Sequence, residues 1–130
     1  MPELPEVESI RRSLSPNIIG QKLQGYKIND HRTNRFNTKK PKINESLLGI
    51  SRKGKLLIFD FEKYSIIFHL GMSGRIQVND KKNKHTRASF YFDKDQINFD
   101  DIRRFGFINI IRSELKNNYL KKIGPDVLNI

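Results

Sequence analysis

Short apolar runs recur along most of the chain, and their length constrains the fold more than any other feature. Runs this short suit β-strands better than helices, and their regular spacing, with polar or Gly-containing turns between them, indicates an antiparallel sandwich or barrel. We expect strands at residues 22–28, 47–52, 55–61, 64–69, 74–79, 86–92, 96–100 and 106–112.

A helix is expected at each end of this β-rich segment. Residues 5–15 carry Val7, Ile10 and Leu14 at helical spacing, and Ser15-Pro16 should end that helix. Residues 114–123 should form a closing helix that stops at Gly124-Pro125. The polar, basic segment 29–42 reads as a loop. The expected fold is mainly β with two helices (α+β): one domain of 130 residues, an antiparallel β-sandwich flanked by an N-terminal and a C-terminal helix.

The charge of the chain is strongly unbalanced. Lys and Arg number 25 against 14 Asp and Glu, which gives a formal net charge of +11. Such a surface favours nucleic acid or an anionic membrane as partner. The abundance of Lys, Ile and Asn together also fits a coding bias toward A·T, in which case much of the Lys is generic solvated surface. No apolar run reaches the roughly 18 residues of a membrane span, and no secretory signal is evident, so we expect no membrane insertion.

Metal and thiol chemistry is not indicated. The chain has no cysteine, which excludes disulfides, a thiol nucleophile and a Cys-ligated zinc site within these residues. His31, His69 and His85 lie far apart and match no metal-ligand spacing. His69 reads as a hydrogen-bonded strand residue rather than a catalyst. We therefore expect no metal and no cofactor in this chain, and a cytoplasmic location.

The first eight residues, MPELPEVE, carry the strongest chemical signal. Removal of Met1 exposes the secondary amine of Pro2, and an N-terminal amine has a pKa of roughly 7.7–8.0, so part of it is neutral near pH 7. A neutral amine can attack a sugar carbon, and the nearby carboxylates of Glu3 and Glu6 can move protons and balance positive charge. The same residues also suit an ordinary helix start, where Pro and Glu are common.

Three further segments stand out, each with a purely structural alternative. Lys55 ends the basic stretch 51–55 before an apolar strand, which is also typical of a turn. Met72 lies between glycines, where a flexible apolar side chain either waits for a partner or folds onto the core. In the segment 101–106, Phe105 two residues after Arg103 can wedge between bases while the guanidinium meets the orphaned base. The alternative is a β-turn with solvated arginines and a core Phe.

Together these strings closely resemble the formamidopyrimidine-DNA glycosylase / endonuclease VIII family, over the whole chain. The combination of MPELPEVE with separate wedges at Met72 and at Arg103 and Phe105 resembles the glycosylase branch. The resemblance implies a bifunctional DNA glycosylase and abasic-site lyase that removes oxidised purines through a Schiff base. Pro2 would be the nucleophile, Glu3 would assist proton transfer, and Glu6 would support the amine. Lys55 would be counted among the catalytic residues and would bind the DNA phosphates around the lesion.

The resemblance also implies how damaged double-stranded DNA is held. Met72 would enter the space left by the flipped base, Arg103 would face the unpaired cytosine, and Phe105 would insert beside it. Arg104 matches the family pattern Asp-Pro-Arg-Arg-Phe-Gly, in which Ile102 replaces the proline. Arg87 is a further candidate for phosphate, although a solvated strand residue is an equal alternative.

Family members continue into a helix–two-turn–helix domain and usually a zinc finger, which these 130 residues do not include. Three interpretations stay open: a fragment of a longer enzyme, a natural truncation with weak activity, or a damaged-DNA-binding module without catalysis. We expect a monomer in each case.

Overall fold

The computed structural model describes residues 4–30, 33, 41–71 and 73–122. These described residues form two helices, one short 3-10 helix and eight strands, which confirms the expected fold class. The elements are α1 (Leu4–Ile18), β1 (Leu23–Ile28), β2 (Gly49–Lys53), β3 (Leu56–Asp60), β4 (Tyr64–His69), β5 (Gly74–Val78), β6 (Thr86–Phe92), β7 (Gln96–Asp101), β8 (Phe107–Arg112), η1 (Ser113–Leu115) and α2 (Lys116–Lys122).

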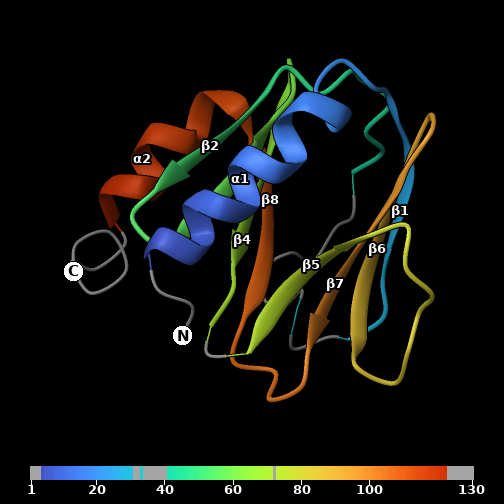
Figure 1. The fold of residues 1–130 in the computed structure, drawn as a ribbon. Coiled ribbons are helices and arrows are strands. Elements are labelled where there is room, and N and C mark those ends of the chain that lie inside the picture. The colour runs from blue at the N-terminus through green and yellow to red at the C-terminus, as the bar shows by residue number, and fades with distance from the viewer. Residues whose placement is uncertain (1–3, 31–32, 34–40, 72, 123–130) are drawn as a thin grey trace.

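The strands form two antiparallel four-stranded sheets that pack face to face (Figure 1). One sheet has the order β1-β6-β7-β5 and the other β2-β3-β4-β8. Phe68 of β4 joins them, because its ring lies 4.9 Å from that of Phe59 in its own sheet and 5.4 Å from that of Phe90 in the other. All three rings are buried, so the aromatic side chains form the centre of the core.

The helices cover different parts of this sandwich. Val7, Leu14 and Ile18 of α1 are buried in the main core with residues of both sheets. Tyr119 and Leu120 of α2 pack instead against a second, smaller apolar cluster on the outer face of the β2-β3-β4-β8 sheet. That cluster exists because side chains alternate between the two faces of a strand: Leu56 and Ile58 of β3 point outward, whereas Leu57 and Phe59 point into the main core.

Two helix boundaries differ from the prediction. α1 continues through Pro16 to Ile18. Pro16 provides no N–H for the carbonyl of Arg12, but Ile18 is fully buried, four residues after Leu14, and its burial favours a further turn of helix. At the other end the chain first forms η1, and α2 begins only at Lys116. The predicted stop at Gly124-Pro125 lies outside the described residues, as does most of the loop 29–42.

Neither helix in the described ranges is long and apolar enough to span a membrane.

Candidate nucleic-acid interface

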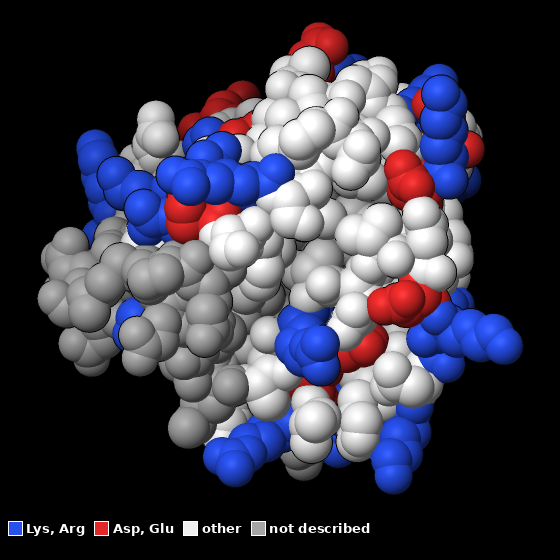
Figure 2. Space-filling view, viewed as in Figure 1, with Lys and Arg blue, Asp and Glu red and all other residues white. Residues whose placement is uncertain are grey.

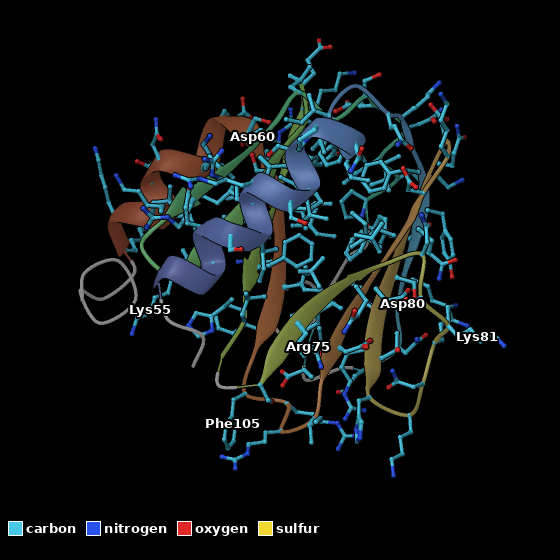
Figure 3. The ribbon with its side chains drawn as sticks, in the orientation of Figure 1. Lys55, Asp60, Arg75, Asp80, Lys81 and Phe105 are labelled. Atoms are coloured by element: carbon cyan, nitrogen blue, oxygen red, sulfur yellow. The ribbon has the colours of Figure 1, made fainter. Side chains whose placement is uncertain are left out.

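Lys55 lies in the two-residue turn that joins β2 to β3. Lys53 and Leu56 are paired across this hairpin, and Gly54 takes the first turn position with a left-handed φ of 58°. Glycine adopts that conformation without steric cost, which is why the hairpin can close so tightly. The Lys55 side chain is partly exposed, and Figure 3 shows it near the start of α1.

A cluster of charged side chains fixes α1 beside this hairpin. The Glu8 carboxylate accepts hydrogen bonds from Arg11 (3.0 Å) and Arg12 (3.1 Å) in the helix and from Arg52 of β2 (3.2 Å). Hydrogen bonding from Arg11 is the main reason why the pKa of Glu8 falls from 4.5 to about 2. The cluster therefore places the first turns of α1 next to the strand that leads to Lys55.

Pro2, Glu3 and Met72 lie outside the described residues. The backbone of Glu6 belongs to the first turns of α1, but its side chain is also outside the described part. α1 begins at Leu4, and Figure 1 shows this end of the helix near the hairpin between β2 and β3.

At the lower end of the sandwich in Figure 1, the turn between β4 and β5 lies against the loop between β7 and β8. A Cβ atom on Gly71, whose φ is +64°, would lie 2.6 Å from the amide nitrogen of Gly106 and 2.8 Å from the carbonyl carbon of Phe105. A Cβ atom on Gly106 would lie 2.5 Å from the carbonyl oxygen of His69. The two backbones therefore touch directly, and the segments on either side of Met72 lie next to the Arg-Arg-Phe loop.

Phe105 is 54% exposed at the tip of this loop, and Figure 3 shows it projecting from the sandwich. This contradicts the alternative of a core Phe. Ile102 is exposed as well, at 60%. Arg103 points to solvent, whereas Arg104 adopts a left-handed φ of 59° and its Nε donates to Asp30 at 2.5 Å. The loop thus presents the apolar side chains of Ile102 and Phe105 to solvent. The Arg103 guanidinium is also exposed, whereas that of Arg104 is paired with Asp30.

Arg87 is buried, so the alternative of a solvated strand residue is wrong. Its Nε donates to the carbonyl oxygen of Asp101 at 2.9 Å, and its guanidinium lies 3.9 Å from the Asp30 carboxylate. A buried guanidinium can contact few phosphate oxygens unless the side chain moves. A role of Arg87 in DNA binding stays a prediction. His69 is also buried, and its ring stacks on Phe107 with the centroids 4.7 Å apart.

Sequence reasoning gave no role to three residues of this region. Asp101 is fully buried and accepts hydrogen bonds from the Ser73 hydroxyl and the Gly106 amide, and Asp30 pairs with Arg104. Ser73 directly follows Met72, and Asp101 begins the segment 101–106, so a search for buried partners next to the singled-out residues could have found both. Asp30 stands in a polar segment with no distinguishing pattern.

Within the described ranges, no group of three or more His, Cys, Asp or Glu side chains could hold a metal ion.

Comparison with known proteins identifies the family. The family model of the formamidopyrimidine-DNA glycosylase N-terminal domain matches residues 1–108. The chain belongs to this family. Formamidopyrimidine-DNA glycosylase of Lactococcus lactis subsp. lactis (strain IL1403) is 37% identical over 135 residues, which cover 97% of this chain and 50% of that protein. The protein of the same name from Acinetobacter baumannii (strain SDF) is 32% identical, with 98% and 48% covered.

Solved structures agree with this assignment. The Lactococcus lactis glycosylase, bound non-covalently to DNA that contains an abasic site, matches with a TM-score of 0.81 and 32% identity over 93% of this chain and 49% of that one. The same enzyme in complex with a THF-DNA and an inhibitor gives a TM-score of 0.82 and 32% identity, with 93% and 48% covered. The chain thus spans about half the length of the formamidopyrimidine-DNA glycosylases it matches.

Proposed function

We propose that the chain acts in base-excision DNA repair as the nucleophile-bearing part of a DNA glycosylase with abasic-site lyase activity. The observation that carries this proposal is the family match over residues 1–108, which includes the N-terminal string with Pro2 and Glu3. Further support comes from Lys55 beside the start of α1 and from the exposed tip of the loop at Phe105. Oxidised purines in duplex DNA are the expected substrates.

The chemistry starts once the damaged nucleotide has left the base stack, because its glycosidic bond cannot be reached inside the duplex. The Pro2 nitrogen attacks C1′, and the glycosidic electron pair leaves with the base. Glu3 carries the proton released by the Pro2 nitrogen to the ring oxygen O4′, so that the C1′–O4′ bond breaks and C1′ and the nitrogen form an iminium, whose positive charge the carboxylate balances. The resulting iminium acidifies the C2′ proton, and loss of that proton allows elimination of the 3′ phosphate, which cuts the strand. Lys55 would hold a phosphate beside the reacting sugar.

Borohydride trapping on abasic-site DNA tests this proposal. An abasic site requires no base recognition, so we expect a reduced covalent adduct even with these 130 residues, weaker than with a full-length relative. Peptide mapping should place the adduct on Pro2. Intact-mass measurement must first show that Met1 is removed, because a Met-capped chain cannot offer the Pro2 amine.

The matched controls are the Pro2→Gly variant and the same chain acetylated at its N-terminus. Adducts found on lysine peptides, or trapping that acetylation does not reduce, would contradict the role of Pro2. The second candidate function, a damaged-DNA-binding module without catalysis, is favoured by the exposed loop alone. It predicts preferential binding of abasic duplex with no trapped adduct.

A further inference from the structure

The carboxylate of Asp101, at the end of β7, is fully buried and holds two separate segments of the chain. Its Oδ1 accepts a hydrogen bond from the Ser73 hydroxyl at 2.6 Å, and its Oδ2 accepts one from the Gly106 amide at 2.8 Å. Ser73 belongs to the turn between β4 and β5, whereas Gly106 closes the loop between β7 and β8. One side chain therefore ties the turn to the far end of the loop.

The Ser73 hydroxyl continues this connection to the near end of the loop. It donates to Asp101 and accepts a hydrogen bond from the amide of Arg103 at 3.0 Å. Both ends of the four-residue segment 102–105 are thus fixed to the same Ser73–Asp101 pair. The backbones of Gly71 and Gly106 also lie so close together that no side chain fits between the turn and the loop.

The exposed residues of the loop depend on this support. Phe105 and Ile102 are more than half exposed and lie on a segment whose own side chains contribute nothing to the core. A loop that is already ordered loses less conformational entropy when it inserts into DNA than one that must be ordered on binding. Fixing the loop in the free protein therefore favours insertion.

We propose that Asp101 and Ser73 are positioning residues that set the Arg103–Phe105 wedge before DNA arrives and join it to Gly71 and Ser73 of the segment between β4 and β5. The proposal rests on the proposed function in one respect: it requires that the loop contact damaged DNA. It does not require the chemistry of Pro2.

The Ser73→Ala variant is the sharpest test, because removal of the buried Asp101 risks unfolding the chain. The measurement is the ratio of affinities for a duplex with an abasic site and for the intact duplex, by titration of the full chain. We expect Ser73→Ala to lower this ratio by about two- to tenfold, the effect of one net hydrogen bond. Ser73→Thr keeps the hydroxyl and should restore the ratio.

Ser65→Ala is the matched control. The Ser65 hydroxyl donates to the Asp60 carboxylate at 2.9 Å, in the β3–β4 hairpin, and Figure 3 shows Asp60 at the opposite end of the sandwich from Phe105. This variant loses a similar bond and should lower stability without changing the affinity ratio. In a Phe105→Ala background, Ser73→Ala should cause no further loss of preference, because the wedge it positions is already gone.

An unchanged affinity ratio in folded Ser73→Ala would overturn the positioning role, as would an equal loss with and without Phe105. If the parent chain shows no preference for the abasic duplex, the wedge itself fails and this inference fails with it. Failure of borohydride trapping alone would reject only the catalytic role of Pro2, so the two proposals can be rejected separately.

Discussion

At the scale of single residues, Gly71 most clearly shows how backbone geometry shapes the candidate site. Its φ of +64° is strained for any residue with a side chain, and an added Cβ would meet the backbone of Phe105 and Gly106 at 2.8 Å and 2.6 Å. We expect Gly71→Ala to destabilise the chain by about 1–3 kcal/mol, and to weaken the preference for abasic DNA because the loop must move. Urea denaturation and duplex titration measure the two effects.

Gly49→Ala is the control for this residue-scale prediction. Gly49 begins β2 with no left-handed φ, and an added Cβ would meet nothing within 4 Å. Replacement there should leave stability unchanged or raise it by about 0.4–1 kcal/mol, through a less flexible unfolded chain. Equal losses of stability in the two variants would show that the contact between the turn and the loop is not what constrains Gly71.

At the scale of elements, the Glu8 cluster joins α1 to β2 and makes that junction sensitive to pH. The pKa of Glu8 is about 2 in the folded chain and near 4.5 when the chain is unfolded, so the folded state binds this proton more weakly. Its stabilisation is therefore fully present above about pH 4.5 and is lost as the pH falls toward 2. Glu8→Gln should lower the unfolding midpoint at pH 7 and have little effect at pH 2.

Thermal unfolding of both chains at pH 7, 3.5 and 2 checks this, with Glu114→Gln as the control. Glu114 pairs with Arg112 at 2.5 Å, but both side chains are largely exposed, at 66% and 60%, so the pair should contribute little. A Glu8→Gln effect that persists unchanged at pH 2 would show that the lost interaction does not depend on the ionised carboxylate.

The positions of the strands were the part of the structure that the sequence predicted best. Strand positions follow from alternating or continuous apolar runs, which are local signals, and every expected strand is present. The predicted end of α1 was wrong. Pro16 is a local stop signal, whereas the burial of Ile18 depends on its packing in the core that both sheets form. Local patterns cannot predict a contact of that kind.

At the scale of the whole molecule, the same distinction separates the predictable part of the site from the rest. Lys55, Arg103 and Phe105 were recognisable from short strings, but the Asp101–Ser73 bond joins residues 28 positions apart. Arg104 and Asp30 are 74 positions apart. Such pairs meet because the two sheets bring the ends of β1, β4, β5, β7 and β8 together. An arginine in a sequence gives no sign of a distant carboxylate.

The whole molecule carries a net charge of +11, and Figure 2 shows Lys and Arg side chains projecting around the edge of one face. We expect DNA binding to be dominated by phosphate contacts, so that log K falls linearly with log salt concentration, with a slope of roughly −0.9 for each phosphate neutralised. Lys55→Ala should make the slope shallower by about one such unit and weaken abasic and intact duplexes alike, because phosphate contacts carry no sequence information.

Lys94→Ala removes the same charge from the turn between β6 and β7, at the opposite end of those strands from Asp101. It is the matched control, because a general loss of charge would change both slopes equally, whereas a phosphate contact at Lys55 changes only one. Phe105→Ala should behave in the opposite way to Lys55→Ala. Its slope should stay as in the parent chain while the preference for the abasic duplex disappears, since an apolar wedge releases no counterions and acts only where a base leaves the stack easily. Identical slopes for Lys55→Ala and Lys94→Ala would remove Lys55 from the DNA interface.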